Sequence, residues 1–208
     1  MEIECENVAG FDMIGWSNHE VTLKPKTDFL MPTDDAKHRY WSEPEYLELS
    51  ERTNWLIEMS NGSIEVLDYP TLTHQRILGF MCRCLDNFVR PRDLGHAIFA
   101  AYPLRLGNLQ FREPDILFAL TEHSSWFGEK FATGADLVME VVSEDRGRDF
   151  ETKRSEYEQA GIPEYWIVDP REEQITILRL ENGAYVAAER AAGERAESTI
   201  LPGFSVDV

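Results

Sequence analysis

A short apolar run interrupted by a single carboxylate constrains the fold of this chain more than any other feature. The run is Leu137-Val138-Met139-Glu140-Val141-Val142, and Glu140 has two apolar neighbours on each side. Apolar, β-rich runs of this length predict strands. In a strand, Glu140 shares its face with Val138 and Val142, so we expect it to reach solvent only at the rim of a cleft. An ionised carboxylate inside a sheet is costly unless a cation compensates it.

Two further charged residues stand next to predicted strands. Asp115 opens the predicted strand Pro114-Asp115-Ile116-Leu117-Phe118. Lys153 lies about one turn into a helix predicted at residues 149–160. A long lysine side chain at that position can reach back over the end of the Glu140 strand.

Each of these three residues has an ordinary alternative role. Glu140 could lie on an edge strand, or it could pair with an arginine such as Arg112 or Arg148. Pro-Asp is a common dipeptide at turns and strand entries, which would account for Asp115. Lys153 could be an exposed helical lysine that pairs with a nearby carboxylate. The three residues therefore indicate a site only in combination.

The remaining patterns predict a sheet flanked by helices. Apolar residues recur at intervals of three and four from Thr73 to the Arg90-Pro91 stop, which predicts a helix. Asn61-Gly62 lies between two apolar runs and predicts a hairpin. Strands are predicted at 55–59, 63–69, 96–106, 114–120, 136–143, 164–169, 174–180 and 184–189, and helices at 42–52, 73–89 and 149–160. We therefore expect an α/β or α+β domain with a mixed central β-sheet flanked by helices.

The first 40 residues show no sustained hydrophobic period. They combine short apolar pieces with Lys24-Pro25-Lys26 and Asp34-Asp35. We predict that residues 1–40 form an N-terminal extension or arm, and that residues 41–208 form the domain.

The chain is strongly acidic, and its acidity is uneven. It has 208 residues, with 20 Lys or Arg against 38 Asp or Glu, and a formal net charge of −18. Residues 114–170 alone hold five Lys or Arg against 13 Asp or Glu. This balance argues against a nucleic-acid partner, because phosphate binding needs clustered cations. A bound metal and a local basic patch would remove the conflict. Candidates for the patch are Arg76, Arg83, Arg90, Arg92, Arg105 and Arg112.

Composition also bears on location. No apolar stretch approaches the roughly 20 residues that a membrane helix needs, and the N-terminus lacks the regions of a signal peptide. We therefore expect a soluble, cytoplasmic protein with no membrane partner. Cys5, Cys82 and Cys84 have no second cluster with which to complete a metal site, so we interpret them as reduced core thiols.

Several sequence strings in a fixed order resemble a known family. The chain contains WLIEMSNG, THQRI, EPDILF, GADLVMEVVS, RDFETKRSEY, AGIPEYWIVDP and LPGF. This series resembles the "putative restriction endonuclease" family of the PD-(D/E)XK nuclease superfamily, from about Trp41 to Val208. The resemblance implies a restriction-endonuclease-like fold, in which an Asp and a Glu on adjacent strands hold one or two divalent cations for phosphodiester hydrolysis.

The resemblance also implies roles for individual residues. Asp115 is the motif's Asp and Glu140 its acidic residue, and both would be metal ligands. Val142 stands where the superfamily pattern has its Lys, and the matching basic position here is Lys153. Glu58 matches a family Glu that implies an additional metal ligand, although a sheet-edge Glu before the hairpin turn would explain it equally well.

The implied chemistry suits these residue types. Hard divalent ions such as Mg²⁺, for which Mn²⁺ can substitute, prefer oxygen ligands and activate a bound water. The two carboxylates would hold the metal, the backbone carbonyl of Val141 would add an oxygen, and Lys153 would assist the water. His74 and Gln75 open the long helix and are candidates for substrate binding, although a His in the first helical turn is more often a surface or capping residue.

Three classes of function remain open from the sequence. The first is a Mg²⁺-dependent endonuclease that acts on DNA. The second is a catalytically silent or regulatory module on the same fold, which works through a protein partner. The third is a two-carboxylate glycoside hydrolase, which lacks any other carbohydrate signal. A homodimer is also open, because nucleases that cut both strands often act as dimers.

Overall fold

The computed structural model describes residues 39–208. The arm predicted at residues 1–40 falls almost entirely outside the described residues, and so does Cys5. The other two cysteines, Cys82 and Cys84, are partly buried free thiols.

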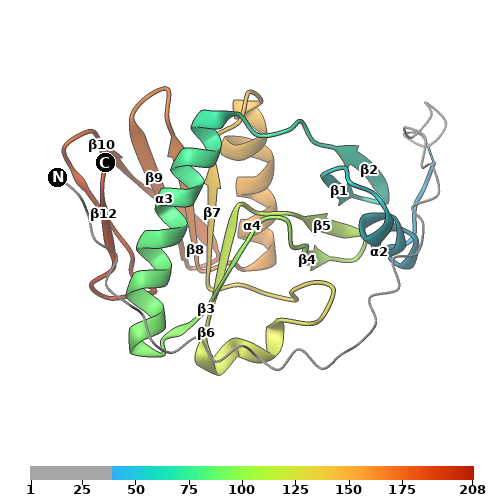
Figure 1. Cartoon of the computed structure of the whole chain (residues 1–208), viewed down its shortest axis with the longest axis horizontal. Helices are drawn as coiled ribbons and strands as arrows, with labels where there is room; N and C mark the ends of the chain where they lie inside the picture. Colours follow the sequence, from blue (N-terminus) through green and yellow to red (C-terminus); the bar gives the residue numbers. More distant parts are fainter. Residues whose placement is uncertain (1–38) are drawn as a thin grey trace, which may run out of the picture. The chain divides into compact units, whose positions relative to one another are not determined.

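A six-stranded mixed sheet forms the centre of the described domain, in the order β10-β9-β8-β7-β6-β3 (Figure 1). Its strands are β3 (Gly95–Phe99), β6 (Ile116–Leu120), β7 (Leu137–Val141), β8 (Glu164–Asp169), β9 (Gln174–Glu181) and β10 (Ala184–Ala191). The β7–β8 pair is parallel, and the other neighbours are antiparallel. The predicted mixed central sheet is therefore confirmed, and the Glu140 strand lies in its interior rather than at its edge.

Helices cover both faces of this sheet. Helix α3 (Leu72–Val89) packs its buried Leu78 and Leu85 against one face, where Phe118 belongs to the same core. A π-helical turn, η3 (Arg148–Lys153), continues into α4 (Arg154–Ala160). Tyr157 of α4 packs with Leu117 and Val138 on the opposite face. Successive residues of a strand point to opposite faces of the sheet, so each face contributes side chains to its own core.

A second, antiparallel sheet has the order β2-β1-β5-β4. Its strands are β1 (Ile57–Ser60), β2 (Ser63–Val66), β4 (Leu104–Gly107) and β5 (Gln110–Arg112). The predicted hairpin is confirmed, with Asn61 and Gly62 at φ angles of 50° and 79° in the turn. Helix α2 (Glu43–Arg52) begins at a capping box of Ser42 and Glu45 and buries Tyr46 against Phe111.

The remaining elements are short. They are the 3-10 turns η1 (Arg90–Arg92) and η2 (Thr121–Trp126), and the strand pair β11 (Arg195–Glu197) and β12 (Ser205–Asp207). Within residues 39–208, no helix has both the length and the apolar character that crossing a membrane requires.

One predicted strand is wrong in its extent. The apolar run 96–106 forms two strands, β3 and β4, which belong to different sheets. Pro103 lies between them and has no N–H with which to continue a ladder. Leu104 instead pairs with Arg112 of β5, a strand that the sequence pattern did not predict. The chain thus passes from the second sheet at Arg112 to the central sheet at Ile116, and Asp115 lies in the short connection between them.

Candidate functional site

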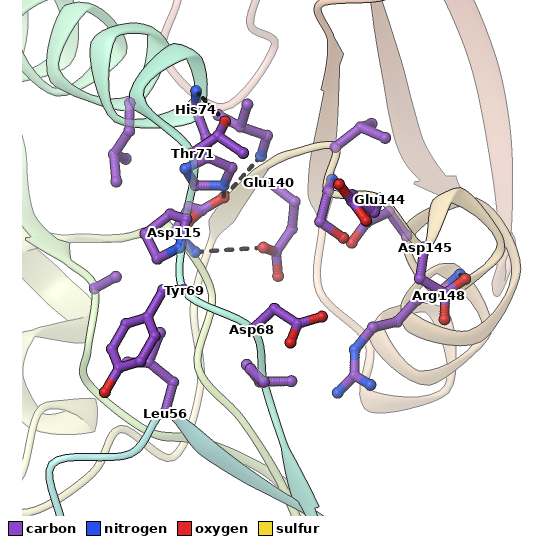
Figure 2. A pocket seen from close by; sticks show the side chains of 18 of the residues that line it. Leu56, Asp68, Tyr69, Thr71, His74, Asp115, Glu140, Glu144, Asp145 and Arg148 are labelled. Carbon is purple, nitrogen blue, oxygen red and sulfur yellow. Dashed lines mark hydrogen bonds and ion pairs between the residues drawn. The ribbon is translucent and has the colours of Figure 1, made fainter.

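An open cleft of about 1050 Å³ lies where the ends of several elements meet. It is lined by the segment after β2, the first turn of α3, the residues before β6, the end of β7 and the η3 turn. Figure 2 shows His74 and Asp115 on one side of the cleft, Glu144, Asp145 and Arg148 on the other, and Glu140 between them. The lining contains seven Asp or Glu against three Lys or Arg. The cleft is therefore rich in negative charge.

Asp115 directly precedes β6 and projects into the cleft with a side chain that is 14% exposed. Its Oδ2 accepts a hydrogen bond from the Val141 backbone N–H at 2.8 Å and lies 3.1 Å from His74 Nε2. Its own N–H points to Glu140 Oε2 at 3.4 Å. These contacts follow from the pairing of β6 with β7, whose register sets Ile116 opposite Met139. Asp and Glu thus stand on adjacent strands, as the resemblance implied.

Glu140 is almost fully buried in β7, with 2% of its surface exposed. Its Oε1 accepts hydrogen bonds from Tyr157 Oη and Lys153 Nζ, each at 2.8 Å. Burial raises the pKa of Glu140 to about 8; Lys153 opposes that shift, and the nearby carboxylate of Asp115 adds to it. The arginine pairing that sequence reasoning left open is not observed for Glu140 among residues 39–208.

Lys153 is buried rather than exposed; it is the last residue of the π-helical turn and lines the cleft. Besides Glu140, its Nζ contacts Asp149 Oδ1 at 3.4 Å. Burial alone would lower the pKa of Lys153, but Glu140 and other carboxylates outweigh it and raise the pKa above its usual value. Lys153 is therefore an ammonium group fixed at the floor of the cleft. π-helical turns within helices are frequent at functional sites.

His74 and Gln75 lie in the first turn of α3, and both line the cleft. Burial lowers the pKa of His74, but its hydrogen bond to Asp115 and the charges of Asp115 and Glu140 together outweigh that effect, and the net shift is upward. Its Nδ1 is buried and has no hydrogen-bond partner in the described chain. Gln75 is exposed. The structure brings His74 to the carboxylates and leaves Gln75 at the mouth.

Glu58 occupies a different environment. It is fully buried in β1 and does not line the cleft. Its Oε2 is 2.9 Å from Arg112 Nη1 and also bonds to Arg148 Nη2, while its Oε1 accepts from the Glu113 N–H at 3.0 Å. Both oxygens are thus engaged within the protein. The role of Glu58 as an additional metal ligand stays a prediction, and these contacts favour a structural role.

We call the charged group around Glu58 the arginine cluster, and it consists of Glu58, Glu65, Arg112, Arg148 and Glu156. Arg112 is fully buried and donates to all three glutamates, with distances from 2.6 to 2.9 Å. Arg148 bonds to Glu58 and lies 2.7 Å from Glu65. The cluster joins the β1–β2 hairpin and β5 to the η3–α4 segment. It therefore ties the second sheet to the segment that carries Lys153.

Sequence reasoning missed two residues close to the carboxylates. Tyr157 donates to Glu140 and lies four residues after Lys153, so helical spacing could have placed both on one face. Glu113 lines the cleft, and its Oε2 is buried without a hydrogen-bond partner in the described residues. Burial raises the pKa of Glu113 to about 8, and Glu58 adds to the shift. In the sequence, the only signal for a role of Glu113 was its position two residues before Asp115.

The donor set at the cleft fits a hard divalent cation. Asp115 and Glu140 supply carboxylate oxygens, and Asp115 Oδ1 accepts no hydrogen bond from residues 39–208. Burial and the carboxylates of Asp115 and Asp149 raise the pKa of Glu140 in spite of Lys153, and a bound cation would oppose that shift. Within residues 39–208, no three His, Cys, Asp or Glu side chains are grouped to hold a metal alone. Mg²⁺ suits such a site, because it usually binds one or two carboxylates and retains several waters.

Comparisons with known proteins agree with this architecture. Residues 43–208 match the model of the Uma2 family, described as "Putative restriction endonuclease". Among solved structures, the chain is similar to the crystal structure of a "putative nuclease" from Anabaena variabilis, with a TM-score of 0.60 and 19% sequence identity. The similarity covers 72% of this chain and 84% of that chain, and at this identity it shows the fold alone. The comparison with curated proteins gives no match.

Proposed function

The chain belongs to the Uma2 family of restriction-endonuclease-like proteins, and from that premise we propose that it is a metal-dependent endonuclease acting on DNA. The observation that carries the proposal is the convergence of Asp115, Glu140 and Lys153 in one cleft. Their contacts run from the Asp115 N–H to Glu140 at 3.4 Å, and from Glu140 to Lys153 at 2.8 Å. Carboxylate and lysine side chains are mostly exposed in proteins, so their burial together at one site indicates a functional role.

When bound, a Mg²⁺ or Mn²⁺ ion would neutralise phosphate oxygens and lower the pKa of a water molecule. Asp115 and Glu140 would hold that ion, with the Val141 carbonyl as a further oxygen donor. Glu58, which the family resemblance implies as an additional ligand, already bonds through both oxygens to Arg112, Arg148 and the Glu113 N–H, so we assign it to the support of the site. The Val141 N–H fixes Asp115 Oδ2, so Oδ1 is left to face the cleft. The backbone of β7 thus orients the carboxylate that opens β6.

Lys153 acts as a positioned cation. Its ammonium is held at Glu140 Oε1 and near Asp149, so it can donate a hydrogen bond into the cleft without a large movement. An ammonium at this place orients the attacking water or stabilises the charge that grows on the phosphate. His74, fixed against Asp115, and Gln75 at the mouth would contact the substrate beside the scissile bond.

Cleavage of supercoiled plasmid in Mg²⁺ or Mn²⁺ tests the proposal. We expect Asp115→Ala, Glu140→Ala and Lys153→Met each to lower the cleavage rate by about 10²- to 10³-fold, as expected for loss of a transition-state charge contact. Glu144→Gln is the matched control, because Glu144 lines the same cleft but is exposed. Undiminished cleavage by purified Asp115→Ala and Glu140→Ala would refute the site assignment.

A catalytically silent module is the second candidate, and the excess of carboxylates in the cleft favours it, because that charge repels a phosphate backbone. The same assay separates the two candidates. Folded wild-type protein that leaves both plasmid and linear DNA intact in either metal would support the silent module. Metal-dependent cleavage that EDTA abolishes would exclude it.

A further inference from the structure

A stripe of exposed residues runs along the outer face of α3, away from the sheet. Its members are Leu72, Arg76, Phe80, Arg83, Asn87 and Arg90, all of them exposed. They follow one another at intervals of three or four residues, which keeps them on one side of a helix. We call this set the α3 stripe. The opposite side of the helix carries Leu78, Met81 and Leu85 into the core.

Three arginines give the α3 stripe its charge. Arg76, Arg83 and Arg90 are seven residues apart, so they lie roughly 10 Å apart along the helix axis and span about 21 Å. From Leu72 to Arg92, α3 and η1 contain four Arg and one Asp. This surface is therefore basic in a chain whose formal net charge is −18.

The arginines of the α3 stripe are also available. In the described part of the chain, Arg76 and Arg83 form no ion pair, and Arg90 forms an exposed i,i+4 pair with Asp86 at 3.2 Å. Exposed pairs of that kind contribute little. Two other candidates for a basic patch are occupied: Arg112 is buried in the arginine cluster, and Arg105 pairs with Glu43 at 3.0 Å. The structure thus reduces the six sequence candidates to the four on α3 and the η1 turn that follows it.

The α3 stripe begins at the cleft. Thr73, His74 and Gln75 of the same helix line the cleft, and Arg76 is the next residue. Figure 1 shows that α3 then crosses the front of the six-stranded sheet. A polyanion whose reacting phosphate lies between Asp115 and Lys153 could continue directly onto this helix. The exposed Phe80, at 47%, adds an apolar contact for a sugar or a base.

We infer that the α3 stripe binds the sugar–phosphate backbone of DNA beside the scissile phosphate, with Arg76 and Arg83 as its main contacts. This inference rests on the proposed function, because the cleft defines where the DNA must pass. It explains how a chain with an acidic cleft and surface engages a polyanion. The metal would serve the reacting phosphate, and α3 would hold the flanking ones.

Binding of a short fluorescein-labelled DNA duplex, measured by anisotropy in EDTA over a series of salt concentrations, tests the inference. Each phosphate contact contributes about 0.9 to the slope of log affinity against log salt. We expect the double variant Arg76→Ala, Arg83→Ala to bind more weakly and to reduce the slope by roughly 2. The matched control is Arg154→Ala, Arg190→Ala, which removes the same charge from an exposed site on α4 and a partly exposed site on β10. We expect the control to retain the wild-type slope.

Plasmid cleavage in Mg²⁺ by the same proteins distinguishes failure of the inference about α3 from failure of the proposed function. If wild type binds and cleaves DNA but the α3 double variant has the wild-type slope and rate, the inference is overturned and the proposed function stands. An equal loss in both double variants would also overturn it, because bulk charge would then explain the effect. If wild type neither binds nor cleaves DNA, the proposed function itself is contradicted, and with it the inference that rests on it. Circular dichroism of the variants checks that α3 is intact.

Discussion

The carboxylates of the arginine cluster are bonded to arginine side chains, whereas the cleft keeps a carboxylate oxygen without a partner among the described residues. Arg112 uses Nε, Nη1 and Nη2 on glutamates, and both oxygens of Glu58 accept hydrogen bonds. In the cleft, Asp115 retains an oxygen without a partner among the described residues, and Glu140 Oε2 has only a 3.4 Å contact. The two groups lie on neighbouring elements and use the same residue types.

The difference separates structure from function. Glu58 is held so firmly by cations that its pKa falls to about 2, although burial alone would raise it, while the pKa of Glu140 rises to about 8. At Glu58 three cations outweigh the effect of burial on the pKa, whereas at Glu140 Lys153 does not outweigh it. The comparison therefore predicts that changes in the arginine cluster act on stability, and that changes in the cleft act on metal binding and catalysis.

The largest effect on stability is expected for Arg112→Ala. Removing this guanidinium takes away one of the two arginines bonded to the buried Glu58 and both bonds to Glu156, and breaking a buried pair in this way costs about 3–5 kcal/mol. Urea unfolding followed by circular dichroism measures the loss.

Arg105→Ala is the control for Arg112→Ala, since Arg105 is 38% exposed and its pair with Glu43 should contribute at most about 1 kcal/mol. Equal stability losses in the two variants would contradict the distinction between the arginine cluster and the surface.

The next prediction concerns acid sensitivity. Burial raises the pKa of Glu58, but Lys153, Arg112 and Arg148 outweigh it and lower the pKa to about 2. Because the folded pKa lies below the unfolded value of 4.5, the stabilisation is present above pH 4.5 and is lost as the pH falls toward 2. It amounts to about 3 kcal/mol. The stability advantage of wild type over Glu58→Gln should therefore shrink across this range.

Chemical denaturation of both proteins at pH 6 and pH 3 measures that change. A difference between wild type and Glu58→Gln that stays constant with pH would mean that Glu58 is not held ionised by its neighbours.

The smallest effect is expected for Tyr157→Phe. It removes the hydroxyl that donates to Glu140 Oε1 at 2.8 Å and leaves the ring packed in the core. Because the pKa of Glu140 is raised to about 8, we use the contribution of a neutral hydrogen bond, about 0.5–1.5 kcal/mol. We expect a loss of stability near the lower end, because Lys153 still bonds to the same oxygen. Thermal unfolding compared with Tyr102→Phe, whose hydroxyl donates to the exposed Gly128 carbonyl, checks this value.

The central sheet could be predicted from the sequence because the patterns that predict its strands are local. The apolar run around Glu140 and the strand after Asp115 each carry their own pattern, and β6 and β7 form where these patterns predicted them. The helix from Asp149 was predicted for the same reason, although its first part is π-helical. The π-helical turn, which buries Lys153, has no local signature.

Long-range contacts explain what the sequence did not predict. β5 is only three residues long, and it forms a strand because it pairs with β1 and β4. The arginine cluster joins residues up to 90 positions apart, as between Glu58 and Arg148. A single sequence offers no rule that pairs a particular arginine with a particular glutamate at such a distance. This is why Glu58 looked as much like a metal ligand as a structural residue.

Titration calorimetry with Mn²⁺ tests most directly whether the unsatisfied carboxylates form the metal site. Wild type should bind Mn²⁺, Asp115→Asn should weaken binding by more than about 100-fold, since it removes a ligand rather than a supporting group, and Glu58→Gln should bind as wild type does. Unchanged affinity in Asp115→Asn would contradict the account. So would loss of affinity in Glu58→Gln with a folded protein, which would assign Glu58 to the metal.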